Sequence, residues 1–95
     1  MSKPPQGHFK ILYFATASSF AGKNEEVLPA PLPVTQLFAT LDARYPGMAA
    51  EVLAQCLVTL NLEYVDVAGE GAGEASNVVI QEGDEVAIIP PVSSG

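Results

Sequence analysis

The sequence predicts one small α+β domain, in which a mixed β-sheet is packed on one side by a single main helix. Hydrophobic residues make up 48% of the 95 residues, which is enough for one core in a chain of this length. Short apolar or alternating runs near both ends are typical of strands. Between them, apolar residues recur with the spacing of one helical stripe, at Val34, Leu37, Phe38 and Leu41. We therefore expect a single domain over residues 1–95.

The first strand is predicted to begin at Phe9, after a polar segment at residues 1–7 that contains Pro and Gly and is expected to be a loose arm. One face of this strand is apolar throughout, and its other face becomes apolar at Leu12 and Phe14. A strand that is apolar on both faces is either covered on both sides or partly used for docking.

Residues 18–24 are rich in Ser and also contain Gly and Asn, which predicts a turn. Residues 25–28 fit a short second strand, which three prolines end at positions 29, 31 and 33.

The main helix follows these prolines. Thr35 is expected to cap its start, and the sequence Tyr45-Pro46-Gly47 is expected to end it. Residues 48–55 fit a second short helix or a turn, because Met48 and Val52 are four positions apart.

The second half of the chain predicts further strands, at residues 56–62, 64–67, 78–80 and 85–89. A loop rich in Gly and Glu occupies residues 68–77, and the turn at residues 81–84 places Gly83 where a positive φ is needed. If the first and last strands are parallel neighbours, the helical middle of the chain is their crossover connection.

Composition excludes several classes of function. The net charge is −7 with only four Lys and Arg residues, which argues against nucleic-acid binding. This acidity either steers the protein to a basic partner or keeps it soluble. The apolar runs are too short to span a membrane, and the N-terminus shows no export signal. The single cysteine indicates a reducing compartment, so we expect a cytosolic protein.

The chain offers no self-contained catalytic or metal site. Cys56 has no neighbouring cation in the sequence to lower its pKa, and pairing with the single histidine, His8, is possible only in space. The segment Gly69–Glu74 resembles a phosphate-binding loop, but a strand rather than a helix follows it, and its glutamates would repel phosphate. A buried structural cysteine and a surface loop are the expected interpretations, and we expect no bound metal.

The last six residues, 90–95, are the most informative segment. Pro90 and Pro91 cannot donate backbone hydrogen bonds, so the sheet should stop there. The rest is predicted to project as an extended tail that ends on Gly95, whose carboxylate no Cβ hinders. The alternative is a frayed end without function.

The tail is similar to that of a known family. The segment Gly83–Gly95, whose sequence is GDEVAIIPPVSSG, closely resembles the C-terminus of the small subunit of molybdopterin synthase. Three other segments resemble the same family: residues 9–15, 34–37 and 60–65.

This resemblance implies a ubiquitin-like β-grasp fold and a sulfur-carrier role. An activating enzyme of the E1 type would join AMP from ATP to Gly95, and a sulfur donor would convert the adenylate to a thiocarboxylate. Sulfur would then pass to cyclic pyranopterin monophosphate in the active site of the large subunit, which is expected to form a heterotetramer of two small and two large subunits. No cofactor would be bound permanently.

The resemblance also implies roles for individual residues. The arm that inserts into the partner consists of Pro90, Pro91, Val92, Ser93 and Ser94. The candidate docking face consists of Leu12, Phe14, Ala87 and Ile89, for which a place in the covered core is equally open.

One residue departs from the family pattern, because Ser94 stands where the family has glycine. If the partners require a residue without a Cβ, transfer would slow; since serine is small, we expect tolerance. Two other functions stay open: a carrier of the same fold for thiamin or tRNA thiolation, and a non-covalent β-grasp binding module.

Overall fold

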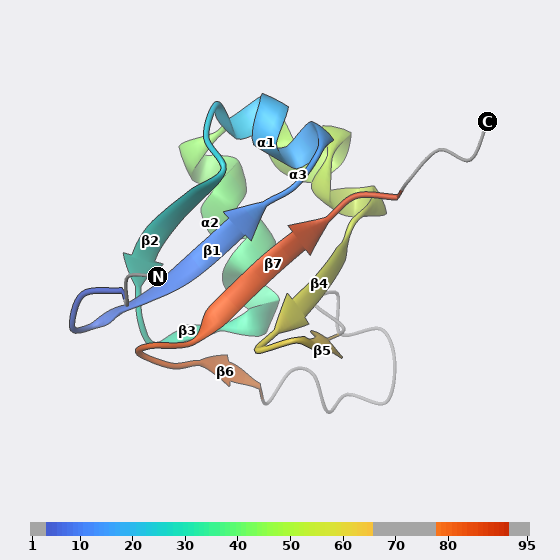
Figure 1. The fold of residues 1–95 in the computed structure, drawn as a ribbon. Helices are drawn as coiled ribbons and strands as arrows, with labels where there is room; N and C mark the ends of the chain where they lie inside the picture. The colour runs from blue at the N-terminus through green and yellow to red at the C-terminus, as the bar shows by residue number, and fades with distance from the viewer. Residues whose placement is uncertain (1–3, 66–77, 92–95) are drawn as a thin grey trace.

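A computed structural model describes residues 4–65 and 78–91 of the chain. Its centre is a five-stranded mixed sheet with the order β2-β1-β7-β4-β5, and a two-stranded sheet, β3-β6, lies beside it (Figure 1). The strands are β1 (His8–Tyr13), β2 (Glu25–Pro29), β3 (Leu32–Pro33), β4 (Leu57–Leu60), β5 (Glu63–Val65), β6 (Val79–Ile80) and β7 (Glu85–Ile89).

The first and last strands are parallel neighbours at the centre of the sheet, which confirms the predicted crossover. Ile11 of β1 lies opposite Val86 of β7, and Tyr13 lies opposite Ile88. The strands β2 and β4 flank this pair, each antiparallel to its neighbour. Because β1 and β7 run in the same direction, both end at the side of the sheet from which the C-terminal segment leaves (Figure 1).

The helices pack against one face of this sheet (Figure 1). They are α1 (Thr16–Ala21), α2 (Leu37–Arg44) and α3 (Met48–Glu51), with 3₁₀ turns at Val34–Gln36 and Leu53–Gln55. Leu37 and Leu41 of α2 are fully buried against the sheet residues Phe9, Ile11 and Ile88. This arrangement of a mixed sheet and a main helix is the predicted α+β fold. None of the helices in the described ranges is long and apolar enough to cross a membrane.

Three local predictions are wrong. The strand predicted at residues 56–62 ends at Leu60, because Asn61 and Leu62 form the turn that leads into β5. Most of the segment predicted as a turn at residues 18–24 is the helix α1, which the packing of Ala17 and Phe20 against the core stabilises. Thr35 does not cap the main helix, because residues 34–36 form a 3₁₀ turn and no side chain caps α2. For α1, tertiary packing overrides the local preference of Ser for turns.

The turns around β7 agree with prediction. Gly83 has a φ of 85°, so it occupies the left-handed region that glycine tolerates best. The strand β7 ends at Ile89, directly before the two prolines, as predicted. The predicted loop at residues 68–77 lies outside the described ranges.

Candidate functional site

The face of the sheet that the helices leave open is apolar at its centre. Side chains alternate across a strand, so the core takes Ile11 and Tyr13 from β1, while Leu12 points to the opposite side. The register then places Ala87 of β7 beside Leu12, and Thr59 of β4 beside Ala87. One contiguous surface therefore extends across three strands.

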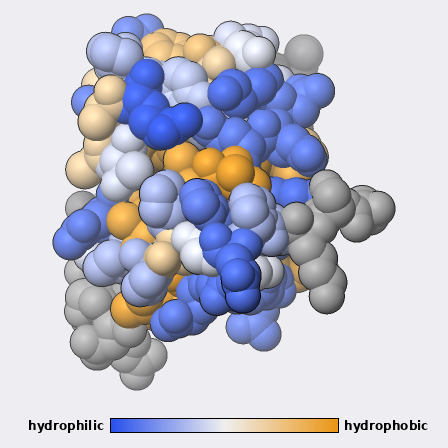
Figure 2. Space-filling model, turned by 90° about the vertical axis from the view of Figure 1, so that its left-hand side faces the viewer, coloured by the Kyte–Doolittle hydropathy of each residue, from blue (hydrophilic) through white to orange (hydrophobic). Residues whose placement is uncertain are grey.

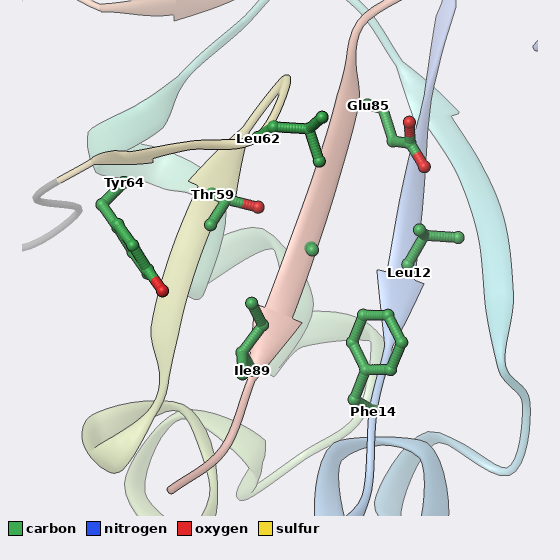
Figure 3. A pocket seen from close by; sticks show the side chains of 8 residues that line it. Leu12, Phe14, Thr59, Leu62, Tyr64, Glu85 and Ile89 are labelled. Carbon is green, nitrogen blue, oxygen red and sulfur yellow. The ribbon is translucent and has the colours of Figure 1, made fainter.

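This surface holds a shallow pocket of about 300 Å³ (Figure 3). We call it the open-face pocket. Its lining residues come from β1 and the residue after it, from β4, β5 and β7, and from the turn between β4 and β5: Leu12, Phe14, Thr59, Leu62, Tyr64, Glu85, Ala87 and Ile89. Three of these apolar or aromatic side chains are well exposed, Phe14 at 47%, Tyr64 at 70% and Leu62 at 88%. Such a cluster on so small a protein is typical of a surface that binds a partner.

All four residues predicted for docking line this pocket. Leu12 and Ile89 are half-buried, Phe14 is exposed, and Ala87 is 9% exposed because it lies at the floor between its neighbours. The structure thus places them on the open face and away from the helix-covered core. Their role in docking stays a prediction.

Sequence reasoning missed Leu62 and Tyr64. The signal was present in Asn61, because asparagine tolerates the positive φ of a two-residue hairpin turn. A hairpin centred on Asn61 and Leu62 pairs Tyr64 with Thr59, which brings Tyr64 to the open face.

Charged side chains lie beside the apolar centre of this face. The Lys10 ammonium is 3.9 Å from a carboxylate oxygen of Glu25, and Glu85 lies beside Lys10 in register. The half-buried Glu85 lines the pocket with its carboxylate. An incoming apolar surface would therefore meet negative charge at one end of the face.

The start of the C-terminal tail lies next to a second, polar pocket of about 210 Å³. Pro90 is buried, whereas Pro91 is exposed. Both line this pocket together with Thr16 of α1 and with residues of α3 and the following 3₁₀ turn, among them Glu51 and Gln55. The predicted tail residues Val92, Ser93, Ser94 and Gly95 lie outside the described residues.

A buried carboxylate ties the elements behind this end of the sheet together. Glu26 of β2 accepts hydrogen bonds from the hydroxyls of Tyr13 and Tyr45, and pairs with Arg44 at 3.0 Å and Lys23 at 3.4 Å. Burial alone would raise the pKa of Glu26, but the two hydroxyls and the two cations together lower it. Burial, with the neighbouring carboxylate, raises the pKa of Tyr13 far above its usual range. This set is a structural clamp rather than an acid–base pair.

Cys56 matches the structural interpretation. Its thiol donates a hydrogen bond to the carbonyl of Val52 at 3.1 Å, and burial raises its pKa. The imidazole of His8 is hydrogen-bonded locally to the carbonyl of Gln6, at 3.0 Å, on the first strand. In the described part of the chain, no recorded contact places a cation beside Cys56. Cys56 therefore lacks the surroundings of an activated nucleophile.

The side of the molecule that carries β2 is mostly hydrophilic, with a small hydrophobic area among polar side chains (Figure 2). A shallow groove lies between β2 and α2, lined by residues that include Leu28, Ala39, Ala43 and Arg44. It has fewer large exposed apolar side chains than the open-face pocket, which is the stronger candidate for a partner.

Comparisons with known proteins agree with this arrangement. Residues 11–95 match the ThiS family. A molybdopterin synthase sulfur carrier subunit from Phaeosphaeria nodorum is 61% identical over 98% of this chain and 96% of its own length. The fold is similar to the crystal structure of the H. volcanii small archaeal modifier protein 1, with a TM-score of 0.67, 23% identity, and coverage of 90% of this chain and 99% of that one.

A second solved structure shows the same fold in a complex. It contains subunits 1 and 2 of the molybdopterin-converting factor from Helicobacter pylori, and the matched chain has a TM-score of 0.62 and 20% identity, covering 93% of this chain and 99% of its own. These structural similarities establish the β-grasp architecture that the ubiquitin-like resemblance implied.

Proposed function

Because this chain belongs to the ThiS family and is 61% identical to a molybdopterin synthase sulfur carrier subunit, we propose that it is the sulfur-carrier subunit of a molybdopterin synthase. The observation that carries the proposal is the similarity to that subunit over 98% of the chain, together with the family match over residues 11–95, which includes the GDEVAIIPPVSSG end. The described part of the structure supports it with an apolar open face, suited to a partner, beside the start of the tail.

The chemistry is assigned to Gly95. Its carboxylate attacks the α-phosphorus of ATP in an E1-like activating enzyme, so pyrophosphate leaves and an acyl adenylate forms. A persulfide-type sulfur donor then attacks the acyl carbon, and AMP leaves. Reductive release from the donor, by a thiol that becomes a disulfide, leaves a thiocarboxylate on Gly95. This species carries one sulfur atom to cyclic pyranopterin monophosphate, and two such deliveries supply the dithiolene of molybdopterin.

The fold determines where this chemistry can occur. The open-face pocket and the start of the tail share one end of the β1–β7 pair, since Phe14 and Ile89 lie at the ends of parallel strands. A partner that covers the face is therefore next to Pro90. Chain length alone limits the reach of the five residues from Pro91 to Gly95 to about 17 Å. The partner's active site must lie within that distance of its docking surface.

The partners proposed are the large subunit, in a heterotetramer of two small and two large subunits, and the activating enzyme. A net charge of −7 favours partners with basic surfaces. We place the protein in the cytosol, where the thiol of its single cysteine, Cys56, would stay reduced. Nucleotide is bound only transiently, as AMP on Gly95.

Mass spectrometry of the intact protein tests the proposal. After incubation with ATP, an activating enzyme and a sulfur donor, the protein should gain the mass difference between sulfur and oxygen, located at Gly95. The matched variant lacks Gly95; it should still bind the large subunit but gain no sulfur. If a related carrier works in the same reaction and this protein does not, the assignment is wrong.

The second measurement separates this function from thiamin or tRNA thiolation. The thiocarboxylated protein, mixed with the large subunit and cyclic pyranopterin monophosphate, should form molybdopterin. A thiocarboxylate that forms but is never consumed there would point to another acceptor. A Gly95 deletion that retained full biological activity would instead point to a non-covalent binding module.

A further inference from the structure

Unusual backbone conformations border the open face. In the described ranges, three residues other than glycine have a positive φ: Ala15 at 52°, Asn61 at 51° and Leu62 at 74°. Ala15 directly follows Phe14, and Leu62 itself lines the open-face pocket. Asparagine tolerates this region, but leucine does so poorly. Strained backbone of this kind gathers at binding sites when the surrounding structure maintains it.

The turn that carries Leu62 is fixed by a set of hydrogen bonds. The side-chain oxygen of Asn61 accepts from the backbone N–H of Glu85 at 2.9 Å, and the side-chain nitrogen donates to Asp84 at 3.1 Å. The Asn61 backbone N–H donates to the carbonyl of Glu85 at 2.8 Å. Asp84 in turn accepts from the backbone of Gln81 at 2.8 Å. Both the backbone and the side chain of Asn61 are therefore hydrogen-bonded to residues at the start of β7, and these bonds fix the position of the hairpin turn.

Leu62 contributes almost nothing to the core, because it is 88% exposed. Its side chain extends from the turn toward β7, above Thr59 (Figure 3). A large apolar side chain is thus displayed in a disfavoured conformation on a turn fixed by side-chain hydrogen bonds. Folding alone gives no reason for leucine at this position.

We propose that Leu62 is a specificity-determining anchor, which inserts into an apolar socket on the large subunit that docks on the open face. This inference rests on the proposed function and extends its docking surface beyond the four predicted residues. The turn presents the side chain already in place, so little conformational entropy is lost on binding. Glu63, Asp84 and Glu85 surround the turn in sequence and space, and a socket with basic residues on its rim would complement them.

Two substitutions test the anchor. Leu62→Ala removes the apolar side chain, and Leu62→Asn removes it while supplying a residue that favours a positive φ. Both should weaken binding to the large subunit, measured by titration calorimetry, on the order of tenfold or more, as expected for a central apolar contact. Leu62→Asn should melt at the same temperature as the wild type or higher, so lost affinity could not be attributed to unfolding.

A matched control is Val27→Ala, which shortens another exposed apolar side chain, on β2 and outside the pocket. It should change the affinity less than about twofold, in the range of non-anchor residues. If both Leu62 variants bind within that range while Phe14→Asp loses binding, the face docks the partner but the anchor inference is wrong. If Phe14→Asp also binds normally, the docking surface itself is wrong. Sulfur loading of Gly95 tests the carrier function independently of either result.

Discussion

Several charged residues in the described part of the chain form ion pairs. Among them, Glu26 should be the one whose replacement with alanine destabilises the protein most. The Glu26 side chain is 7% exposed, and it accepts hydrogen bonds from Tyr13 and, at 2.7 Å, from Tyr45. Alanine would leave both hydroxyls without this acceptor. Tyr13 is the more costly case, because only 2% of its surface is exposed and water reaches it poorly.

The size of the effect follows from these contacts. A hydrogen bond to a charged group contributes about 1.5–3 kcal/mol. Tyr45 is only half-buried, so water can replace part of its bond, whereas Tyr13 would lose nearly the full amount. The exposed ion pairs with Lys23 and Arg44 add little, about 0–1 kcal/mol each. We therefore expect Glu26→Ala to lower the free energy of unfolding by about 2–3 kcal/mol, and to lower Tm by roughly 10–20 °C.

Urea denaturation followed by circular dichroism measures this loss directly. Glu26→Gln is the matched variant, because glutamine keeps an acceptor oxygen and similar shape but no charge. It should retain part of the stability, with a loss of about 1 kcal/mol. A loss below about 0.5 kcal/mol for Glu26→Ala, the range of ordinary surface substitutions, would refute the argument that Tyr13 depends on this carboxylate.

Three further results are expected. The pKa of Glu26 is lowered in the folded state, so the stability that its carboxylate contributes is present above pH 4.5, the ordinary pKa, and is lost as the pH falls through the folded pKa. Acid should therefore destabilise the wild type more than Glu26→Gln. Equal acid sensitivity of the two proteins would contradict this. Phe14 lines the open-face pocket and is 47% exposed, so Phe14→Asp should abolish binding to the large subunit in a pull-down. The far-UV circular dichroism spectrum should stay unchanged. Retained binding would contradict the docking assignment. Burial raises the pKa of the Cys56 thiol, so at pH 7 the thiol should react with iodoacetamide at least about tenfold more slowly in the folded protein than in urea. Equal rates would show that the thiol is accessible and ionised in the folded protein.

The sequence predicted the architecture well, because strong local signals agreed with the tertiary fold. The apolar stripe that includes Leu37 and Leu41 does face the core, and the prolines after Ile89 do end β7. The helix α1 was not predicted, because its six residues carry little intrinsic preference and depend on Ala17 being buried. Local pattern describes an element only when the pattern itself is the source of its stability.

The candidate site was predicted in part for a similar reason. Leu12 and Phe14 were identifiable because they make the second face of a strand apolar. Tyr64 and Leu62 come from a hairpin whose register depends on a two-residue turn at Asn61, and a shift of one position would have sent Tyr64 to the opposite face. The Glu26 clamp joins residues up to 19 positions apart in sequence, and no periodicity indicates such a contact.

The parallel pairing of β1 and β7 connects the proposed docking face to the start of the tail. An antiparallel pairing of the same two strands would place Phe14 and Ile89 at opposite ends of the sheet, so a partner bound at Phe14 would be a strand's length from Pro90. In the parallel register, Tyr13 lies opposite Ile88, so the next residues, Phe14 and Ile89, reach the same edge. In the proposed complex, docking on the open face would therefore determine the position from which the tail starts. If Gly95 carries the sulfur, as we propose, this shared edge is the geometric requirement for delivery to a partner on the open face.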